Sequence, residues 1–275
     1  MDFKRIQIIF LVTFIVIDVF LFSLLRRNQN VQTENLNSDN STSIVAEMHN
    51  DQISFNRQPS NHSGSGYYLG ADKNDQLRSR VALLNNQNAH DSHLKLQSTF
   101  KQPVALNSSE PHLTVNHLLD DPTFVSFGSH YHYSYDLSTP RTLVYVQRFA
   151  GQPIFSNSAE IRFHVADHML NGYTQSYVSQ VHNLREKAAT LSARKALAIL
   201  YQYNNIPNDT KIRWEHFAYI KLLSVKGHDV YLPTWVVALK SPGSSRLVYK
   251  YVNAFNGSVI NLNNQREALR SATRS

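Results

Sequence analysis

The stretch "TLSARKALAILYQYNNIP", residues 190–207, decides the fold class because the hydrophobic period changes within it. Apolar residues at helical spacing, among them Leu197, Leu200 and Tyr201, predict a helix. Ser192 is the expected N-cap, and Pro207 ends the segment. The sequence therefore predicts one helix among segments whose apolar residues alternate.

Four segments after this helix are rich in aromatic and β-branched residues and are separated by turn sequences. They are "KIRWEHFAYIKLLSV" (211–225), "DVYLPTWVVAL" (229–239), "RLVYKYVNAF" (246–255) and "SVINL" (258–262). One helix followed by four antiparallel strands indicates an α+β layer.

Upstream, a short helix is expected in "PHLTVNHLLDD" (111–121) and strands at 94–100, 124–136, 142–149, 153–165 and 173–181. Asn171-Gly172 is the expected hairpin turn between the last two strands. A helix begun by Ser41 or Ser43 and a strand near Ile53 are expected before them. Residues 57–66 are expected to form a flexible loop, since Gly64, Gly66 and Gly70 lack phosphate-loop spacing, and a short strand is expected at residues 67–70.

Two ten-residue segments resemble each other: "YVQRFAGQPI" (145–154) and "YVNAFNGSVI" (251–260). Their shared residues include no acid, base or nucleophile, so the repeat predicts architecture rather than chemistry. Both segments should be hairpins with Gly151 and Gly257 at their turns, because glycine adopts the positive φ that tight turns require.

The N-terminal run "IQIIFLVTFIVIDVFLFSLL", residues 6–25, is long enough to span a bilayer. A cleaved signal peptide is the alternative, but no small-residue cleavage site follows the run. We therefore expect a cytoplasmic tail (1–5), a transmembrane helix (6–25) and a polar linker (26–42). Two subdomains (43–186 and 187–263) and a polar tail (264–275) follow.

Several kinds of chemistry have little support. The chain has no cysteine, and its net charge of +7 is scattered rather than clustered as in a nucleic-acid binder. Ser192 and Lys195 have S-x-x-K spacing, but the S-D-N and K-T-G elements are missing, so Ser192 is interpreted as a helix cap. The histidine pairs 130/132 and 164/168 do not supply the three or four ligands of a zinc site. We expect no cofactor, no metal and no enzymatic activity.

Several segments carry a resemblance to a known family: "MDFKRIQIIFLVTFIVIDVFLF", "AEIRFHV", "SARKALAILYQYNNIP", "YLPTWVV" and "YVNAFNGSVI". Together they resemble the YycI (WalI) family, which is related to YycH. The resemblance implies two small subdomains of antiparallel sheet packed with helices, with a PepSY-like character. It also implies a single-pass cell-membrane protein with its N-terminus in the cytoplasm and its C-terminal domain outside.

The same resemblance implies a non-enzymatic regulator of an essential WalK-like histidine kinase that controls cell-wall metabolism, acting with a YycH-like partner. The membrane helix is the implied contact, with Phe14, Asp18 and Phe22 as partner-binding residues. Asp18 also stands out because an ionisable residue in an apolar span is costly and often functional. The alternatives are a PepSY-type inhibitory or wall-associated envelope binding protein and, third, a membrane-anchored envelope enzyme.

Overall fold

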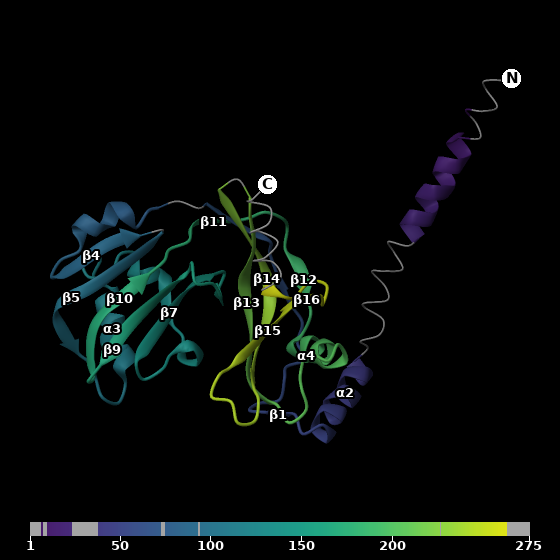
Figure 1. Cartoon of the computed structure of the whole chain (residues 1–275). Coiled ribbons are helices and arrows are strands. Elements are labelled where there is room, and N and C mark those ends of the chain that lie inside the picture. Colours follow the sequence, from purple (N-terminus) through teal and green to yellow (C-terminus); the bar gives the residue numbers. More distant parts are fainter. Residues whose placement is uncertain are drawn as a thin grey trace.

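The computed structural model describes residues 7, 10–23, 38–72, 75–92, 94–225 and 227–262, without the side chains of residues 38–42. In this part of the chain, two seven-stranded sheets lie side by side and form two lobes (Figure 1). We call residues 75–178 the middle lobe, and residues 38–72 with 179–262 the C-terminal lobe. Strands outnumber helices in both, and the predicted α+β class is confirmed.

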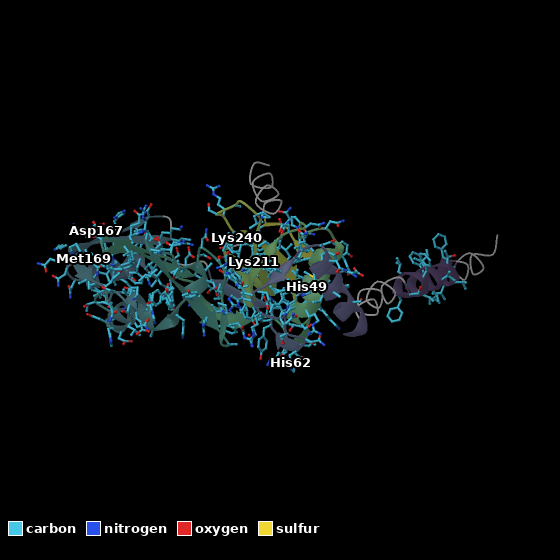
Figure 2. The ribbon with its side chains drawn as sticks, turned by 90° about the horizontal axis from the view of Figure 1, so that it is seen from below. His49, His62, Asp167, Met169, Lys211 and Lys240 are labelled. Carbon is cyan, nitrogen blue, oxygen red and sulfur yellow. The ribbon has the colours of Figure 1, made fainter. Side chains whose placement is uncertain are left out.

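The sheet of the C-terminal lobe is centred on one long antiparallel pair, β13 with β14. Its strands are β1 (Ser54–Phe55), β3 (Leu69–Asp72), β11 (Ser179–Asn183), β13 (Lys211–Val225), β14 (His228–Lys240), β15 (Val248–Asn253) and β16 (Val259–Ile260). The predicted antiparallel order of the last four strands is confirmed, while β1 joins the start of β13 in parallel. Figure 2 labels Lys211 and Lys240, which are cross-strand partners at one end of this pair.

Two helices, α2 (Ser38–Asn50) and α4 (Ala193–Gln202), pack beside this sheet (Figure 1). Leu197 and Leu200 of α4 are fully buried in one cluster with Met48 of α2 and Val237 of β14. The predicted cap is confirmed, because Ser192 Oγ accepts a hydrogen bond from the Lys195 backbone N–H at 3.3 Å. The α4 helix therefore has both the predicted start and the predicted buried face.

The middle lobe has a second antiparallel sheet, in the order β4-β5-β10-β9-β7-β6, with β8 paired to β7. These strands are β4 (Gln87–Ser92), β5 (Lys95–Ala105), β6 (Tyr131–Tyr133), β7 (Thr142–Phe149), β8 (Gln152–Pro153), β9 (Glu160–Ala166) and β10 (Met169–Gln175). The helix α3 (Pro111–Leu119) packs on it through Val115 and Leu119. Buried aromatic side chains, including Tyr145, Phe163 and Tyr173, fill the core.

Three short 3-10 turns, η1 (Arg78–Leu83), η2 (Gly128–His130) and η3 (Tyr135–Leu137), complete the middle lobe. The strand expected over 124–136 is reduced to β6, with η2 and η3 on either side. Phe127 has a left-handed φ of 54°, and a Cβ on Gly128 would lie 2.1 Å from Leu119 O. The chain bends here against the end of α3, which an extended strand could not do.

The prediction of two hairpins from the repeated ten-residue segments is confirmed. In the first, Arg148 and Phe149 pair with Pro153 and Gln152 across a turn at Ala150 and Gly151, whose φ values of 49° and 79° suit a type I′ turn. The second pairs β15 with β16 across residues 254–258, with Gly257 at φ 76°. This second turn is therefore longer than the two-residue turn that Asn256-Gly257 favours.

The hairpin prediction for Asn171-Gly172 is wrong. Both residues lie inside β10, and the turn between β9 and β10 is formed by Asp167 and His168, with φ values of 51° and 58°. Strand register shifts between Leu170 and Gly172, and a Cβ on Gly172 would lie 2.1 Å from the Ser98 carbonyl oxygen. This glycine therefore serves a bulge and a close approach to β5. Figure 2 shows the Asp167 turn at the end of the molecule far from His49 of α2.

Segments on both sides of residue 187 share the C-terminal sheet, which differs from the expected division into 43–186 and 187–263. Leu69 of β3 lies opposite Tyr231 of β14, and Ser54 of β1 opposite Lys211 of β13. The end of the loop expected at residues 57–66 is ordered as β2 (Gly64–Gly66), paired with β12 (Ala188–Thr190), while the short strand expected at 67–70 appears as β3, which begins at Leu69. Long-range pairing decides these positions, and local sequence patterns do not encode it.

Residues 10–23 form a helix, whose large apolar side chains are 46–63% exposed. No helix among the described residues is long and apolar enough to cross a membrane. Most of the expected linker (26–42) and all of the expected tails (1–5 and 264–275) lie outside the described residues, although α2 already begins at Ser38.

Candidate functional site

The three residues expected to bind a partner, Phe14, Asp18 and Phe22, lie on the helix of residues 10–23. Their four-residue spacing places them along one side of that helix. All three are exposed, Phe14 by 59% and Phe22 by 56%. The helix therefore presents an aromatic face with one carboxylate at its centre.

A second candidate is a cleft of about 820 Å³ lined by both lobes. The middle lobe contributes residues 106–112, which are the loop after β5 and the start of α3, and side chains between Tyr133 and Leu143. The C-terminal lobe contributes Asn56, Arg213, Trp214 and Leu247. The sequence prediction did not include this cleft, because its walls come from residues far apart in the chain.

Local hydrogen bonds hold the two middle-lobe walls of the cleft. Asn107 Oδ1 accepts from the backbone N–H groups of Ser109 and Glu110, at 2.9 and 3.0 Å. Ser138 Oγ donates to Ser134 O at 2.7 Å and accepts from Val144 N–H at 2.9 Å. These side chains replace water as partners of loop backbone groups, so the chain's own hydrogen bonds hold these two wall segments.

Stacked ring pairs lie on both sides of the cleft. His112 stacks on Tyr133 with ring centroids 4.9 Å apart, and Trp214 stacks on His216 at 4.7 Å. Tyr135, at the mouth, is 82% exposed. An aromatic lining of this kind is typical of binding surfaces, where rings supply contact area at low entropic cost.

The lobes meet next to the cleft through a polar pair and a strand contact. His216 Nε2 of β13 lies 2.8 Å from Asp136 Oδ2 of η3. Phe155 N–H donates to Tyr219 O at 2.8 Å, and the Phe155 ring contacts those of Trp214 and Tyr249. Burial raises the pKa of the Tyr249 phenol; Arg162 opposes this rise and Asp136 adds to it. One wall of the cleft is thus held by contacts with residues of both sheets.

The histidines and the serine singled out in the sequence do not come together as a metal centre in the part of the chain that the structure describes. No group of three or more His, Asp or Glu side chains there could hold a metal ion. His130 lies in η2 and His132 in β6, while burial, with Arg148 and Arg162 respectively, lowers the pKa values of His132 and His164. Ser192 is committed to capping α4.

Comparisons with known proteins agree with the resemblance seen in the sequence. The YycI protein family matches residues 31–255. No curated protein matches the chain. Among solved structures, an uncharacterized protein from Eubacterium rectale ATCC 33656 is similar at 9% identity, with a TM-score of 0.48 over 77% of this chain and 91% of that one. Because the family match extends over most of both lobes, the chain belongs to the YycI family, a family of regulators associated with the WalK two-component system.

Proposed function

We propose that the chain is a single-pass, membrane-anchored regulator that contacts a WalK-like histidine kinase through its N-terminal helix, with a YycH-like protein as second partner. Its N-terminus lies in the cytoplasm, and its two lobes lie outside the cell. It acts without catalysis, by binding. The observation that carries the proposal is the exposed side of residues 10–23, where Asp18 lies between Phe14 and Phe22.

An exposed apolar helix with a central carboxylate suits a partner helix better than it suits lipid alone. A carboxylate in hydrocarbon costs about 2.5 to 3.5 kcal/mol on insertion scales, and a polar partner reduces that cost. Phe14 and Phe22, one helical turn to either side, would pack around the polar contact.

A regulator of this type changes the kinase by preferring one of its conformations. A sensor kinase alternates between states, and a partner shifts the balance by its difference in affinity for them. Contact along one transmembrane helix is sufficient, because small helix displacements distinguish such states. The two lobes then serve to bind other molecules outside the cell.

The test is co-purification of kinase from detergent-solubilised membranes with the full chain and with Asp18→Leu. A hydrogen bond between membrane helices contributes about 0.6 to 2 kcal/mol, so association should fall about 3- to 30-fold. Asp18→Asn, which keeps a hydrogen-bonding group, should lose less.

The matched control is Val16→Leu, because Val16 lies on the opposite side of the same helix. Circular dichroism checks that both lobes remain folded in every variant. Undiminished kinase association in Asp18→Leu contradicts the proposed contact.

A further inference from the structure

We propose that the cleft between the lobes is a binding site for a neutral oligosaccharide. Its volume of about 820 Å³ falls within the range of roughly 300–1,000 Å³ that ligand pockets occupy. This site is separate from the helix contact proposed above, so either proposal can fail without the other.

The rings of the cleft suit the faces of sugar rings. A pyranose presents C–H groups on its faces, and these favour the negative face of an aromatic ring. Trp214 from the C-terminal lobe and Tyr133 and Tyr135 from the middle lobe all line the cleft. A chain of several sugar units could contact rings of both lobes, which a single small ligand would not need.

The polar groups of the cleft suit hydroxyl groups. Asn56, Ser108, Ser109 and Thr139 line the walls, and their amide and hydroxyl groups both donate and accept hydrogen bonds. Sugar hydroxyls need both roles from their partners. Asn56 is itself oriented, because its Nδ2 donates to Arg213 O at 2.8 Å.

The charges of the cleft favour a neutral ligand. Its lining includes the carboxylates of Glu110 and Asp136 and the guanidinium of Arg213. Two carboxylates and one guanidinium do not attract a polyanion, and Asp136 already has a partner in His216. A phosphate-rich polymer is therefore a poor occupant.

The backbone of the cleft argues against an extended peptide. Peptides that add to a sheet need a row of free backbone donors and acceptors. Here Ser134 N–H donates to Val144 O, Thr139 and Thr142 exchange hydrogen bonds with each other, and Leu106 N–H donates to His168 O. A ligand in this cleft would therefore be recognised by side chains.

The experiment uses the full chain in detergent micelles, with maltohexaose, cellohexaose and chitohexaose as probes. The chain has two tryptophans. Trp235 packs against the buried cluster that contains Leu197 and Leu200 of α4, and its Nε1 donates to Leu191 O. The Trp235→Phe variant therefore has Trp214, in the cleft, as its single tryptophan reporter. Binding should change Trp214 emission and should appear independently by calorimetry.

Tyr135→Ala and Tyr203→Ala form a matched pair of variants. Both side chains are largely exposed, by 82% and 68%, so neither change should unfold the protein, and only Tyr135 lines the cleft. Loss of one ring contact should weaken binding about five- to tenfold in Tyr135→Ala and less than about twofold in Tyr203→Ala.

The proposal is overturned if none of the three sugars binds at concentrations up to about 10 mM. Equal losses in the two tyrosine variants also overturn it, because binding would then lie outside the cleft. Binding of polyglutamate or of an uncharged octapeptide in place of the sugars assigns the cleft to another ligand class and likewise overturns it.

Discussion

Gly257→Ala should destabilise the protein more than Gly151→Ala, although both glycines occupy the turns of similar ten-residue hairpins. Both have positive φ, 76° and 79°. Their surroundings differ: a Cβ at Gly151 meets nothing within 4 Å, whereas a Cβ at Gly257 would lie 2.6 Å from Ile199 Cδ1 and 3.3 Å from Leu191 Cδ1. The comparison separates backbone strain from packing.

The left-handed backbone alone costs an alanine about 1–2 kcal/mol at either position. Overpacking against α4 adds about 1 kcal/mol at Gly257 only, the low end of the range for overpacking, because the nearest atom is the far end of the Ile199 side chain. The added loss corresponds to a melting temperature lower by roughly 2–4 °C for a folded chain of about 150–250 residues. Thermal and urea unfolding of the full chain in micelles, followed by circular dichroism, measures both variants.

A double-mutant cycle with Ile199→Val identifies the clash, because that substitution removes the Cδ1 atom nearest the new Cβ. Alone it should cost about 0.5–1.5 kcal/mol. In the Gly257→Ala background, Ile199→Val should cost less than it does alone, or should raise the stability, because the effects of substitutions at residues in contact are not additive. Equal losses in the two glycine variants, with additive effects in the cycle, would refute the packing argument.

Two other predictions concern the helix cap and the buried tyrosines. Ser192→Ala should lower the free energy of unfolding by about 1 kcal/mol, because Lys195 N–H loses its partner. Ser192→Thr keeps the oxygen and should lower the free energy of unfolding less. Equal losses of the two variants in urea melts would contradict this prediction. Burial raises the pKa of Tyr231 to about 12 from 10.0, and that of Tyr131 well above 10.0. Because the pKa values are higher in the folded than in the unfolded protein, this contribution to stability should be intact below pH 10 and should fall as pH rises from 10 through 12. The free energy of unfolding should depend less steeply on pH in Tyr231→Phe. Urea midpoints that do not change with pH across this range would contradict the prediction.

Features that depend on neighbouring residues could be predicted from the sequence. The helix α4, its cap at Ser192 and the four strands after it follow from periodicity and capping alone. The aromatic and acidic side of residues 10–23 also follows from local spacing. Each of these features depends on interactions between residues that lie within about one or two helical turns of each other.

Features that depend on contacts between distant segments could not be predicted. Asn171-Gly172 has the strongest local turn signal, yet the approach of the Ser98 carbonyl places it in a bulged strand and leaves the turn to Asp167 and His168. The cleft has the same origin, since Asn56, Glu110 and Trp214 meet only after both lobes have formed.

The two ten-residue segments have similar sequences but different roles in the fold. The second segment stays within one sheet, where Ile260 pairs with Tyr251 and Gly257 packs against α4. The first ends at Ile154, which leaves the middle lobe and bridges to Tyr219 of β13 in the other. The next residue, Phe155, contacts Trp214 at the wall of the cleft. The first hairpin therefore connects the middle lobe to β13 beside the cleft, whereas the second, with nearly the same sequence pattern, stabilises the packing of one sheet on α4.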